Sequence, residues 1–475
     1  MNMIIAIGLY STLTLLAILH IILYGSRPTK SLSWLLIVLI FPFIGIILYI
    51  IFGINRRRFK FFKLKQTVRR RLYDENFRNR LIKEQKIEFE NKKSAKLSTL
   101  LRNSSNFVTQ PANRVKVLQN GKKTFDIIFE ELQKAEKFIH LQYYIFEEGE
   151  LFDRLYFLLK EKLENNVEVR ILYDAIGSYS LRKKAIKKFR DIGASVYPIM
   201  PLHFGSFLFT LNYRNHRKII IVDGKVGFTG GVNISDKYIN PKSELGIWDD
   251  THLYLNGPAV DSLHRVFIKD YYFASNQELL LTNDYLPEIE KHGDVKVQIV
   301  AGGPDADHPS IMQQYITMIN LAEEYIYISN PYFIPNNAML EALRIAALSG
   351  VTIKLLVPKK SDSWLAKYSM LSFFEELLFL GIEIYQQKDD FLHSKVIVMD
   401  GEIASVGSGN FDHRSFEHNF ETNALIYDSP IAESICKDFI TDCGESVLLD
   451  YETYKQRGIK RKLSEGIARF FSPLL

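Results

Sequence analysis

The chain has 475 residues, of which 47% are hydrophobic and 24% are charged, and its formal net charge at pH 7 is +6. This length accommodates two domains of ordinary size and additional segments. Cys436 and Cys443 are the only cysteines, which excludes both a disulfide framework and a zinc knuckle. The composition therefore excludes a small disulfide-rich protein and is typical of a chain whose thiols stay reduced.

Two apolar stretches near the N-terminus predict a membrane hairpin. Residues 3–24 and 34–52 contain no Lys, Arg, Asp or Glu, and each stretch is long enough to cross a hydrocarbon core of about 30 Å as a helix. A signal peptide is the alternative for the first stretch, but it lacks a basic n-region and a second apolar run follows at once. We therefore expect residues 1–54 to form two transmembrane helices, with Pro42 as a kink in the second.

Basic residues are concentrated directly after the second apolar stretch. The link between the two stretches carries Arg27 and Lys30, whereas the segment 56–71 is much richer in positive charge. Its basic residues are Arg56, Arg57, Arg58, Lys60, Lys63, Lys65, Arg69, Arg70 and Arg71. The positive-inside rule therefore places the chain after the hairpin in the cytoplasm. We expect residues 55–110 to be a basic juxtamembrane linker against anionic lipid headgroups. A nucleic-acid patch is the alternative, which the position beside a membrane helix disfavours.

Strands alternate with helices from about residue 111 onward. Strands are predicted at 138–145 and 167–173, and helices at 151–163, 182–192, 337–349 and 364–380. An alternation of this kind predicts an α/β fold.

The second half of the chain repeats the first. Residues 135–146 resemble residues 322–333, and Asp250 and Glu421 occupy corresponding places, each followed by a proline and a helical pattern. A repeat of this size means two copies of one domain. We place the two copies at residues 111–285 and 286–475.

A polar motif is part of this repeat. His216, Lys218, Asp223 and Asn233 recur at identical spacing as His393, Lys395, Asp400 and Asn410. One such set is a weak signal, because short patterns recur by chance. The duplicate indicates one active site assembled from two half-sites, each of which contributes a histidine, a lysine and an asparagine.

The strand that follows each lysine sets the direction of the motif side chains. Residues i and i+2 of a strand point to the same face, so His216 and Lys218 point together, as do His393 and Lys395. By the same parity Asp223 and Asp400 point away from that face, which favours a structural role for them. As members of the motif they nevertheless remain candidate catalytic residues.

The last residues form an amphipathic pattern. On a helix, one face carries Ile459, Leu463, Ile467, Phe470, Phe471 and Leu474, and the other carries most of Lys455, Lys460, Arg461, Lys462 and Arg469. This pattern predicts a C-terminal amphipathic helix at a membrane interface. A terminal helix that packs on its own domain is the alternative.

Two histidines, two lysines and two asparagines suit a phosphodiester. Lys218, Lys395, Asn233 and Asn410 are predicted to bind the non-bridging oxygens and to stabilise the charge of the transition state. One imidazole attacks phosphorus, while the other protonates the departing alcohol. The attacking imidazole needs an acceptor for its other ring proton, and Asp250 and Glu421 are the predicted acceptors.

The duplicated motif resembles the signature of the phospholipase D superfamily. Within it, the N-terminal apolar helices and residues 212–219, 227–233, 248–252, 331–335 and 414–421 look like bacterial cardiolipin synthases. The run 407–410 departs from the bulkier residues usual in that family, and we expect no chemical consequence. The resemblance implies two homologous phospholipase D-type α/β sandwich domains in a pseudo-twofold arrangement.

The resemblance also implies an activity. One phosphatidylglycerol molecule donates its phosphatidyl group to a second and glycerol is released, through a phosphohistidine and without a metal or cofactor. It implies His216 as the nucleophile and His393 as acid and then base, although the residues alone leave this order open. The implied location is a bacterial cell membrane, which the chain crosses more than once, with the catalytic domains in the cytoplasm. The implied partners are phosphatidylglycerol and anionic membrane lipids.

Three alternatives stay open beside this interpretation. A lipid hydrolase or a transferase that uses another alcohol shares the same site. A nuclease of the superfamily is disfavoured by the membrane helices, so no nucleic acid is expected as a partner. A non-catalytic scaffold is disfavoured because both half-sites retain every expected residue. The sequence leaves the oligomeric state open.

Overall fold

The structure is a computed structural model that describes residues 2–25, 28–41, 43–54, 87–89, 91–201, 212–240, 245–277, 284–287 and 290–475. Most of the predicted juxtamembrane linker, including the whole basic segment 56–71, lies outside these residues.

The N-terminal segment contains one long apolar helix. Helix α1 (Asn2–Tyr24) includes an apolar window, Ile7–Tyr24, of sufficient length to cross a membrane, and among the described residues it is the only helix with this property. The second apolar stretch is divided into α2 (Pro28–Ile40), α3 (Ile44–Leu48) and a π-helical turn (Tyr49–Gly53). Phe43 interrupts it with a left-handed φ of 61°, which a helix does not tolerate. The expected second continuous helix is therefore not confirmed, and the predicted kink at Pro42 lies outside the described residues.

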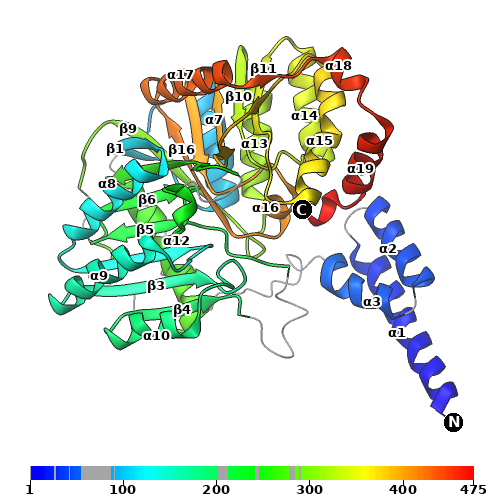
Figure 1. The fold of residues 1–475 in the computed structure, drawn as a ribbon, viewed down its shortest axis with the longest axis horizontal. Coiled ribbons are helices and arrows are strands. Elements are labelled where there is room, and N and C mark those ends of the chain that lie inside the picture. The colour runs from blue at the N-terminus through cyan, green and yellow to red at the C-terminus, as the bar shows by residue number, and fades with distance from the viewer. Residues whose placement is uncertain are drawn as a thin grey trace.

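The rest of the chain is an α/β fold of two repeated halves (Figure 1). The strands of the first half are β1 (Gln110–Gln119), β2 (Phe138–Tyr143), β3 (Glu168–Asp174), β4 (Ser195–Ile199), β5 (Ile219–Val222), β6 (Val226–Gly230) and β8 (Thr251–Asn256). The strands of the second half are β9 (Val295–Gly302), β10 (Tyr325–Ser329), β11 (Thr352–Pro358), β12 (Glu383–Gln387), β14 (Val396–Met399), β15 (Ile403–Gly407), β16 (Glu421–Tyr427) and β17 (Val447–Leu448).

The helices alternate with these strands as the sequence predicted. They are α8 (Gly121–Gln133), α9 (Glu150–Glu164), α10 (Lys183–Asp191) and α12 (Ala259–Ser275) in the first half, and α13 (Ser310–Leu321), α14 (Asn337–Leu348), α15 (Trp364–Phe379) and α17 (Ser429–Glu445) in the second. The predicted helices at 151–163, 182–192, 337–349 and 364–380 are confirmed by α9, α10, α14 and α15.

The strand order shows the internal symmetry. The two halves form one 15-stranded mixed sheet with the order β17-β12-β11-β10-β14-β15-β16-β9-β1-β8-β6-β5-β2-β3-β4. Apart from β17, the order on one side of the β9–β1 junction mirrors the order on the other. The outer strands of each half pair in parallel, β2 with β3 and β3 with β4 in the first half, and β10 with β11 and β11 with β12 in the second. Strands β1 and β9 pair antiparallel and join the halves.

Three apolar cores hold the layers together. One lies between the first half's strands and α8, α9 and α10, and a second lies between the second half's strands and α13, α14 and α15. The third is shared, because β6 and β8 pack against β15 and β16, with α12 and α17 completing it. Burial of apolar area across this shared layer makes the two halves one folded unit.

Helix α7 (Lys92–Ser105) falls in the range predicted as a linker, but it belongs structurally to the second half. Asn91 caps its first turn by accepting a hydrogen bond from the Ser94 amide at 2.8 Å. Leu97 and Leu101 are fully buried in the second half's core. Lys93 forms an ion pair with Asp400 at 2.9 Å. The chain therefore crosses to the second half before it enters β1 of the first.

A buried arginine ties the halves together. Arg217 has no exposed surface, and its Nη1 lies 2.7 Å from both carboxylate oxygens of Asp270. Its Nη2 and Nε donate to the carbonyl oxygens of Gly302 and Glu421, at 2.9 and 3.2 Å. One side chain of the first half thus satisfies two backbone groups of the second.

We expect Arg217→Met to destabilise the protein strongly, because it leaves the Asp270 carboxylate buried without its cation. Breaking a buried pair from one side costs about 3–5 kcal/mol. Denaturant unfolding of the full chain in detergent, followed by near-UV circular dichroism, measures the change. The matched control is Lys187→Met, which removes an exposed ion pair with Asp191 and should cost at most about 1 kcal/mol. Equal effects of the two variants would contradict this role of Arg217.

Candidate active site

The two half-sites are interlocked through their backbones. The His216 amide donates to the Phe420 carbonyl at 2.9 Å, and the Phe420 amide donates to the Arg214 carbonyl at the same distance. In the second half-site, β13 (Phe391–Leu392) pairs in parallel with β7 (Trp248–Asp249), and the His393 amide donates to the Asp249 carbonyl at 2.6 Å. Each histidine is thereby placed beside the residue that directly precedes the carboxylate of the other half, Glu421 or Asp250.

The result is an exchange of carboxylates between the halves. His216 Nδ1 lies 3.1 Å from Glu421 Oε2, and His393 Nδ1 lies 2.5 Å from Asp250 Oδ2. Asp250 and Glu421 therefore lie at the histidines, as their places in the repeat suggested, and each orients the histidine of the opposite half. Because Nδ1 faces the carboxylate in both rings, Nε2 is the ring nitrogen left to react.

Both lysines lie in the same buried site. Lys218 Nζ donates to the His216 carbonyl at 2.7 Å. Lys395 Nζ lies 3.7 Å from Asp250 Oδ2 and 2.8 Å from His393 Nδ1, and it also donates to the His393 carbonyl. Both side chains are almost completely buried. The structure therefore places two cationic groups beside the two imidazoles, as the i and i+2 spacing predicts.

Burial controls the protonation of these bases. It lowers the pKa of Lys218 to about 7 and that of Lys395 to about 8, against the opposing attraction of Glu421 and Asp250. Burial also lowers the pKa of His216, against Glu421, and lowers the pKa of His393 well below its usual range with the help of Lys395 and Lys218. Both imidazoles are therefore neutral at pH 7 in the ligand-free site, as a nucleophile requires.

The two carboxylates differ in their surroundings. Burial would raise the pKa of Glu421, but His216, Lys218 and Ser408 together hold it below its usual range. Glu421 accepts hydrogen bonds from Ser408 Oγ at 2.5 Å, Ser415 Oγ at 3.0 Å and Asn419 Nδ2 at 3.3 Å. Burial raises the pKa of Asp250 to about 6, opposed by Lys395 and Lys218. One half-site therefore holds a fixed negative charge, and the other titrates close to neutral pH.

The two asparagines are used differently. Asn233 Oδ1 accepts from the Ile145 amide at 3.0 Å, and its Nδ2 donates to Tyr238 Oη at 3.2 Å. Asn410 is buried, and its Oδ1 has no hydrogen-bond partner among the described residues. A buried amide oxygen without a partner is costly, and because it only accepts hydrogen bonds it is open to a donor such as a hydroxyl group. The Asn233 amide group already forms hydrogen bonds to Tyr238 and to the backbone.

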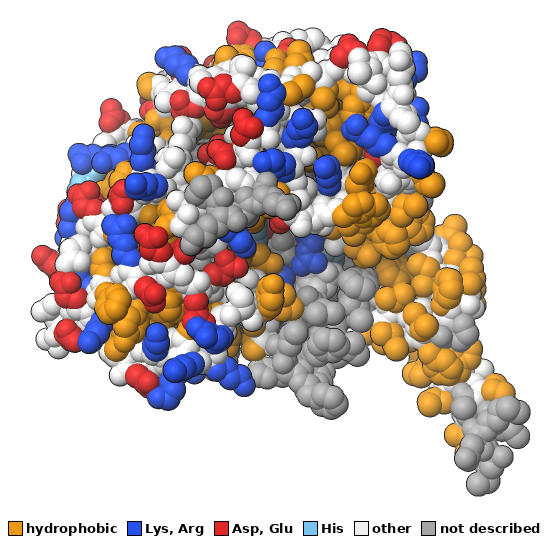
Figure 2. Space-filling model, in the orientation of Figure 1, with side chains coloured by type: hydrophobic (Ala, Val, Ile, Leu, Met, Phe, Trp, Pro, Cys, Tyr) orange, Lys and Arg blue, Asp and Glu red, His pale blue; other side chains and the backbone are white. Residues whose placement is uncertain are grey.

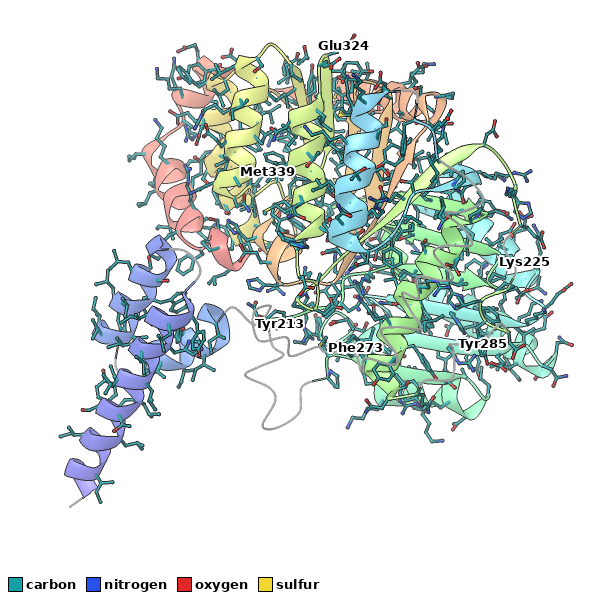
Figure 3. All side chains as sticks on the ribbon, turned by 180° about the vertical axis from the view of Figure 1, so that it is seen from behind. Tyr213, Lys225, Phe273, Tyr285, Glu324 and Met339 are labelled. Carbon is teal, nitrogen blue, oxygen red and sulfur yellow. The ribbon has the colours of Figure 1, made fainter. Side chains whose placement is uncertain are left out.

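Asp223 and Asp400 do not reach the histidines. The Asp223 carboxylate accepts from the backbone amides of residues 136–138, each at 2.8 Å, and the Asp400 carboxylate accepts from those of residues 323–325. Figure 3 shows Lys225 and Glu324 at outer edges of the two halves, whereas Tyr213 lies between them. Both aspartates anchor strand ends, as their parity favoured, and this corrects their place among the candidate catalytic residues.

Aromatic rings line both half-sites. The Tyr144 ring meets His216 edge-on with a centroid distance of 4.7 Å. The Trp248 ring lies 4.7 Å from His393 between centroids, and Tyr238 Oη lies 3.3 Å from His393 Nδ1. These rings limit the rotation of the imidazoles and the access of water.

Sequence reasoning missed several of these residues. Tyr144 and Tyr238 lie at no recognisable spacing from the motifs, and Trp248 belongs to the run 248–252 but received no predicted role. Ser408 belongs to the run that was expected to have no chemical consequence, yet its hydroxyl binds Glu421. Among the residues that the structure describes, no group of three or more His, Cys, Asp or Glu side chains is arranged to hold a metal ion.

Comparison with known proteins identifies the family. A model described as cardiolipin synthase, PLD-like domain matches residues 128–271 and 315–443, and a model described as phospholipase D-nuclease N-terminal matches residues 12–53. A cardiolipin synthase from Geobacillus kaustophilus is 40% identical, over 99% of this chain and 94% of that protein. This chain belongs to the phospholipase D-like cardiolipin synthase family.

Other similarities agree with this membership. A probable cardiolipin synthase from Bacillus subtilis is 37% identical over 98% of this chain and 93% of its own length. The crystal structure of a phosphatidylserine synthase from Haemophilus influenzae superposes with a TM-score of 0.60 at 14% identity, covering 81% of this chain and all of that one. That structure shows a shared fold. The two segments that match the cardiolipin synthase family each contain one complete half-site.

We expect Asp250→Asn and Glu421→Gln to lower turnover of a phosphodiester by about 10²–10⁴-fold, because each removes the charge that orients an imidazole of the other half. Asp223→Asn is the matched control. It should lower stability by about 1–3 kcal/mol through weaker amide capping, and it should leave turnover per folded molecule nearly unchanged. Rates normalised to the folded fraction distinguish the two effects. Equal turnover losses in all three variants would contradict the assignment.

The lowered pKa values of Lys218 and Lys395 predict that activity falls at alkaline pH. Their cationic forms exist below pKa values of about 7 and 8, and kcat/KM reports the ionisation of the free enzyme. We therefore expect kcat/KM for a phosphodiester substrate to fall as pH rises through this range, while acid inhibition begins only below the usual histidine range. Lys225→Met, an exposed lysine outside the site, is the control and should leave the profile unchanged. A profile that is flat through the lysine range would show that the lysines stay charged.

Proposed function

We propose that this protein makes cardiolipin and glycerol from two molecules of phosphatidylglycerol through a phosphohistidine. The observation that carries the proposal is the pair of imidazoles, each held at Nδ1 by a carboxylate of the opposite half, beside two buried lysines. Two reactive Nε2 atoms and two cations are what an exchange of alcohols at one phosphorus requires. Membership of the cardiolipin synthase family supports a lipid substrate.

In the first step, His216 Nε2 attacks the phosphorus of one phosphatidylglycerol. The P–N bond forms while the bond from phosphorus to the headgroup glycerol oxygen breaks, and His393 gives that oxygen a proton. Lys218, Lys395 and the Nδ2 group of Asn410 stabilise the non-bridging oxygens. The bound phosphodiester brings a negative charge, which raises the pKa of the adjacent imidazoles and lysines and favours their charged forms.

In the second step, a headgroup hydroxyl of another phosphatidylglycerol replaces the departed glycerol. His393 takes its proton, the new P–O bond forms, the P–N bond breaks, and cardiolipin leaves. The number of phosphodiester bonds is unchanged over the two steps, so no activated donor is needed.

The opposite pKa shifts of Glu421 and Asp250 support these different roles of His216 and His393. His216 becomes cationic when it is phosphorylated, and Glu421, with three side-chain donors, is the more firmly ionised partner. His393 has to carry a proton, and the raised pKa of Asp250, 2.5 Å from its Nδ1, lets the pair hold one near neutral pH. We therefore assign the nucleophile to His216 and the acid and base to His393.

We also propose a two-pass membrane anchor with cytoplasmic catalytic halves. Helix α1 supplies one span. The second apolar stretch packs back on it, since Ala17, Ile21, Val38, Ile46 and Tyr49 form one cluster. The basic segment 56–71 that follows supports a cytoplasmic exit by the positive-inside rule. The substrate is then phosphatidylglycerol in an anionic leaflet, and nucleic acid is not a partner.

The test is a reaction of the purified full chain with phosphatidylglycerol and a chelator, without any CDP-linked lipid. Cardiolipin and free glycerol should appear in equal amounts, and excess glycerol should drive the reaction backward. His216→Ala and His393→Ala should each lower the rate by at least about 10²–10⁴-fold, whereas His292→Ala at the surface should not. Phosphatidic acid as the main product would show a hydrolase instead, and a requirement for CDP-linked lipid or metal would refute the mechanism.

A further inference from the structure

The C-terminal segment is attached to the protein by its polar side. After β17 the chain forms α18 (Tyr451–Lys455), α19 (Ile459–Phe470) and a 3-10 turn (Ser472–Leu474), and α19 packs on α15. Glu465 of α19 is only 2% exposed and binds Arg457 at 2.7 Å and Arg461 at 3.0 Å. Tyr454 Oη donates to the same carboxylate at 3.2 Å. The Arg461 pair lies within α19, whereas the buried Arg457 pair and the Tyr454 hydrogen bond tie α19 to the chain that precedes it.

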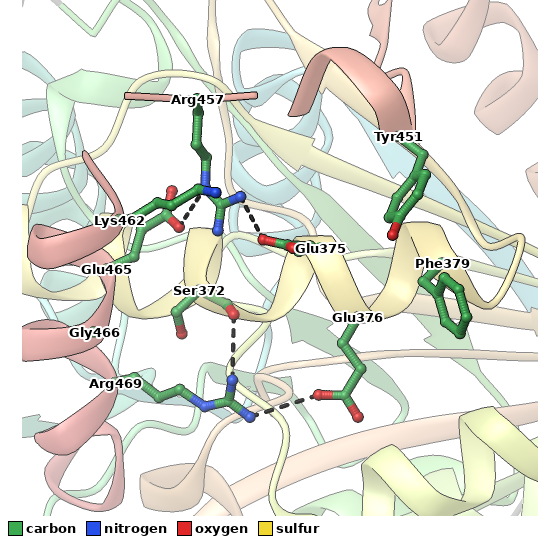
Figure 4. Close-up of a pocket in the computed structure, with 10 residues that line it drawn as sticks. All are labelled: Ser372, Glu375, Glu376, Phe379, Tyr451, Arg457, Lys462, Glu465, Gly466 and Arg469. Atoms are coloured by element: carbon green, nitrogen blue, oxygen red, sulfur yellow. Dashed lines mark hydrogen bonds and ion pairs between the residues drawn. The ribbon is translucent and has the colours of Figure 1, made fainter. Parts of the chain in front are cut away.

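A polar cavity of about 450 Å³ accompanies this attachment. Figure 4 shows it between α15 and α19, with Arg457 directed to Glu375 and Glu465, and Arg469 directed to Glu376. The acidic and basic groups that line it neutralise one another in pairs. The cavity thus belongs to the attachment of α19, and its lining has three carboxylates and, with Lys462, three cations.

The opposite side of the same helix is apolar and uncovered. Ile459, Leu463 and Phe470 are 79%, 63% and 81% exposed, and Ile467 is 48% exposed. Phe471 and Leu474 continue this face beyond the helix and are also exposed. A surface helix of a soluble domain turns its apolar stripe inward, whereas α19 exposes its apolar residues and buries Glu465. Contiguous exposed apolar surface of this kind marks an interaction site.

The end of this segment contacts the wall of the active site. The Leu475 carbonyl accepts a hydrogen bond from the Arg414 amide at 2.9 Å. Arg414 belongs to α16 (His413–Glu417), whose Ser415 donates to Glu421. The Arg414 side chain also donates to Asn212 Oδ1 at 3.2 Å. The apolar face therefore lies a short chain of contacts away from the His216–Glu421 pair.

The surroundings of this face indicate a lipid bilayer as its occupant. Hydrophobic side chains gather in Figure 2 on the side of the molecule where the C-terminal helices approach the apolar N-terminal helices. Lys455, Lys460 and Lys462 are exposed beside the apolar residues, as expected for a helix at anionic headgroups. If a second copy of this chain covered this face, the lysines of the two copies would lie close together and repel each other.

We propose that residues 459–474 lie in the headgroup region of an anionic bilayer and hold the active site near the membrane surface. The apolar face enters the acyl boundary, and the lysines meet lipid phosphates. The membrane contact of residues 459–474 is separate from the proposed reaction. It rests on the proposed function only because the substrate there is a lipid. It explains why a helix with a buried polar side keeps its apolar side outward.

A fluorescence measurement tests the location directly. The full-length Leu463→Cys variant is labelled with a bilayer-sensitive fluorophore and reconstituted in phosphatidylglycerol vesicles with or without brominated acyl chains. The native Cys436 and Cys443 are buried, so the introduced thiol takes the label. We expect quenching by brominated lipid at position 463. No quenching is expected at Phe157→Cys on α9, where Phe157 is 67% exposed. Equal quenching at both positions, or none at 463, overturns the proposal whether or not transfer activity exists.

An activity comparison tests the consequence. We expect Leu463→Glu combined with Ile467→Glu to lower transfer on phosphatidylglycerol vesicles about tenfold, because charge replaces apolar contact with the bilayer. Transfer on a short-chain, water-soluble phosphatidylglycerol should stay unchanged, since no bilayer contact is needed. Phe157→Glu is the matched control and should behave normally on both substrates. Loss on both substrates, or on neither, overturns the proposed role of this face.

Discussion

The exchange of carboxylates between the two halves is the constraint on which the rest of the site depends. His216 is held by Glu421 of the second half, and His393 by Asp250 of the first. All four side chains are buried, and an unpaired buried charge is strongly destabilising. Neither half therefore provides a stable environment for its own motif. The shared apolar layer of β6, β8, β15 and β16 and the buried Arg217 hold the halves in the register that this exchange needs.

A nearly symmetric fold encloses an electrostatically asymmetric site. The strand order is mirrored about the β9–β1 junction, but Glu421 is surrounded by Ser408, Ser415 and Asn419, whereas Asp250 lies beside Lys395. Short polar side chains stabilise a carboxylate without neutralising it. The carboxylates of Asp250 and Glu421, at equivalent positions of the repeat, thus acquire different proton affinities. A reaction that needs one nucleophile and one proton carrier benefits from this difference.

The outer surface of the protein exposes apolar areas that suit a lipid substrate. Helix α1 is apolar over a membrane-spanning length, and α19 presents its apolar side outward while Glu465 is buried beneath it. In water both arrangements expose apolar area at a free-energy cost. In a bilayer the same area is an anchor. A site that lies near a lipid surface also encounters lipid hydroxyls at a higher local concentration than a site in solution.

The sequence by itself determined the local structure and the chemical inventory. Periodicity and the internal repeat were sufficient for the α/β alternation, for helices such as α9 and α15, and for the two sets of histidine, lysine and asparagine, because these features depend on neighbours along the chain. The repeat also located Asp250 and Glu421, and strand parity separated Asp223 and Asp400 from the histidines.

Only the tertiary structure decided how these parts meet. Residues about two hundred positions apart contact one another because of the strand order, and periodicity does not encode that order. The pairing of His216 with Glu421 and the packing of α7 on the second half arise in this way. The amphipathic pattern of 459–474 likewise predicted two faces but not their directions. Burial of Glu465 in an ion-pair network settled which face turns outward.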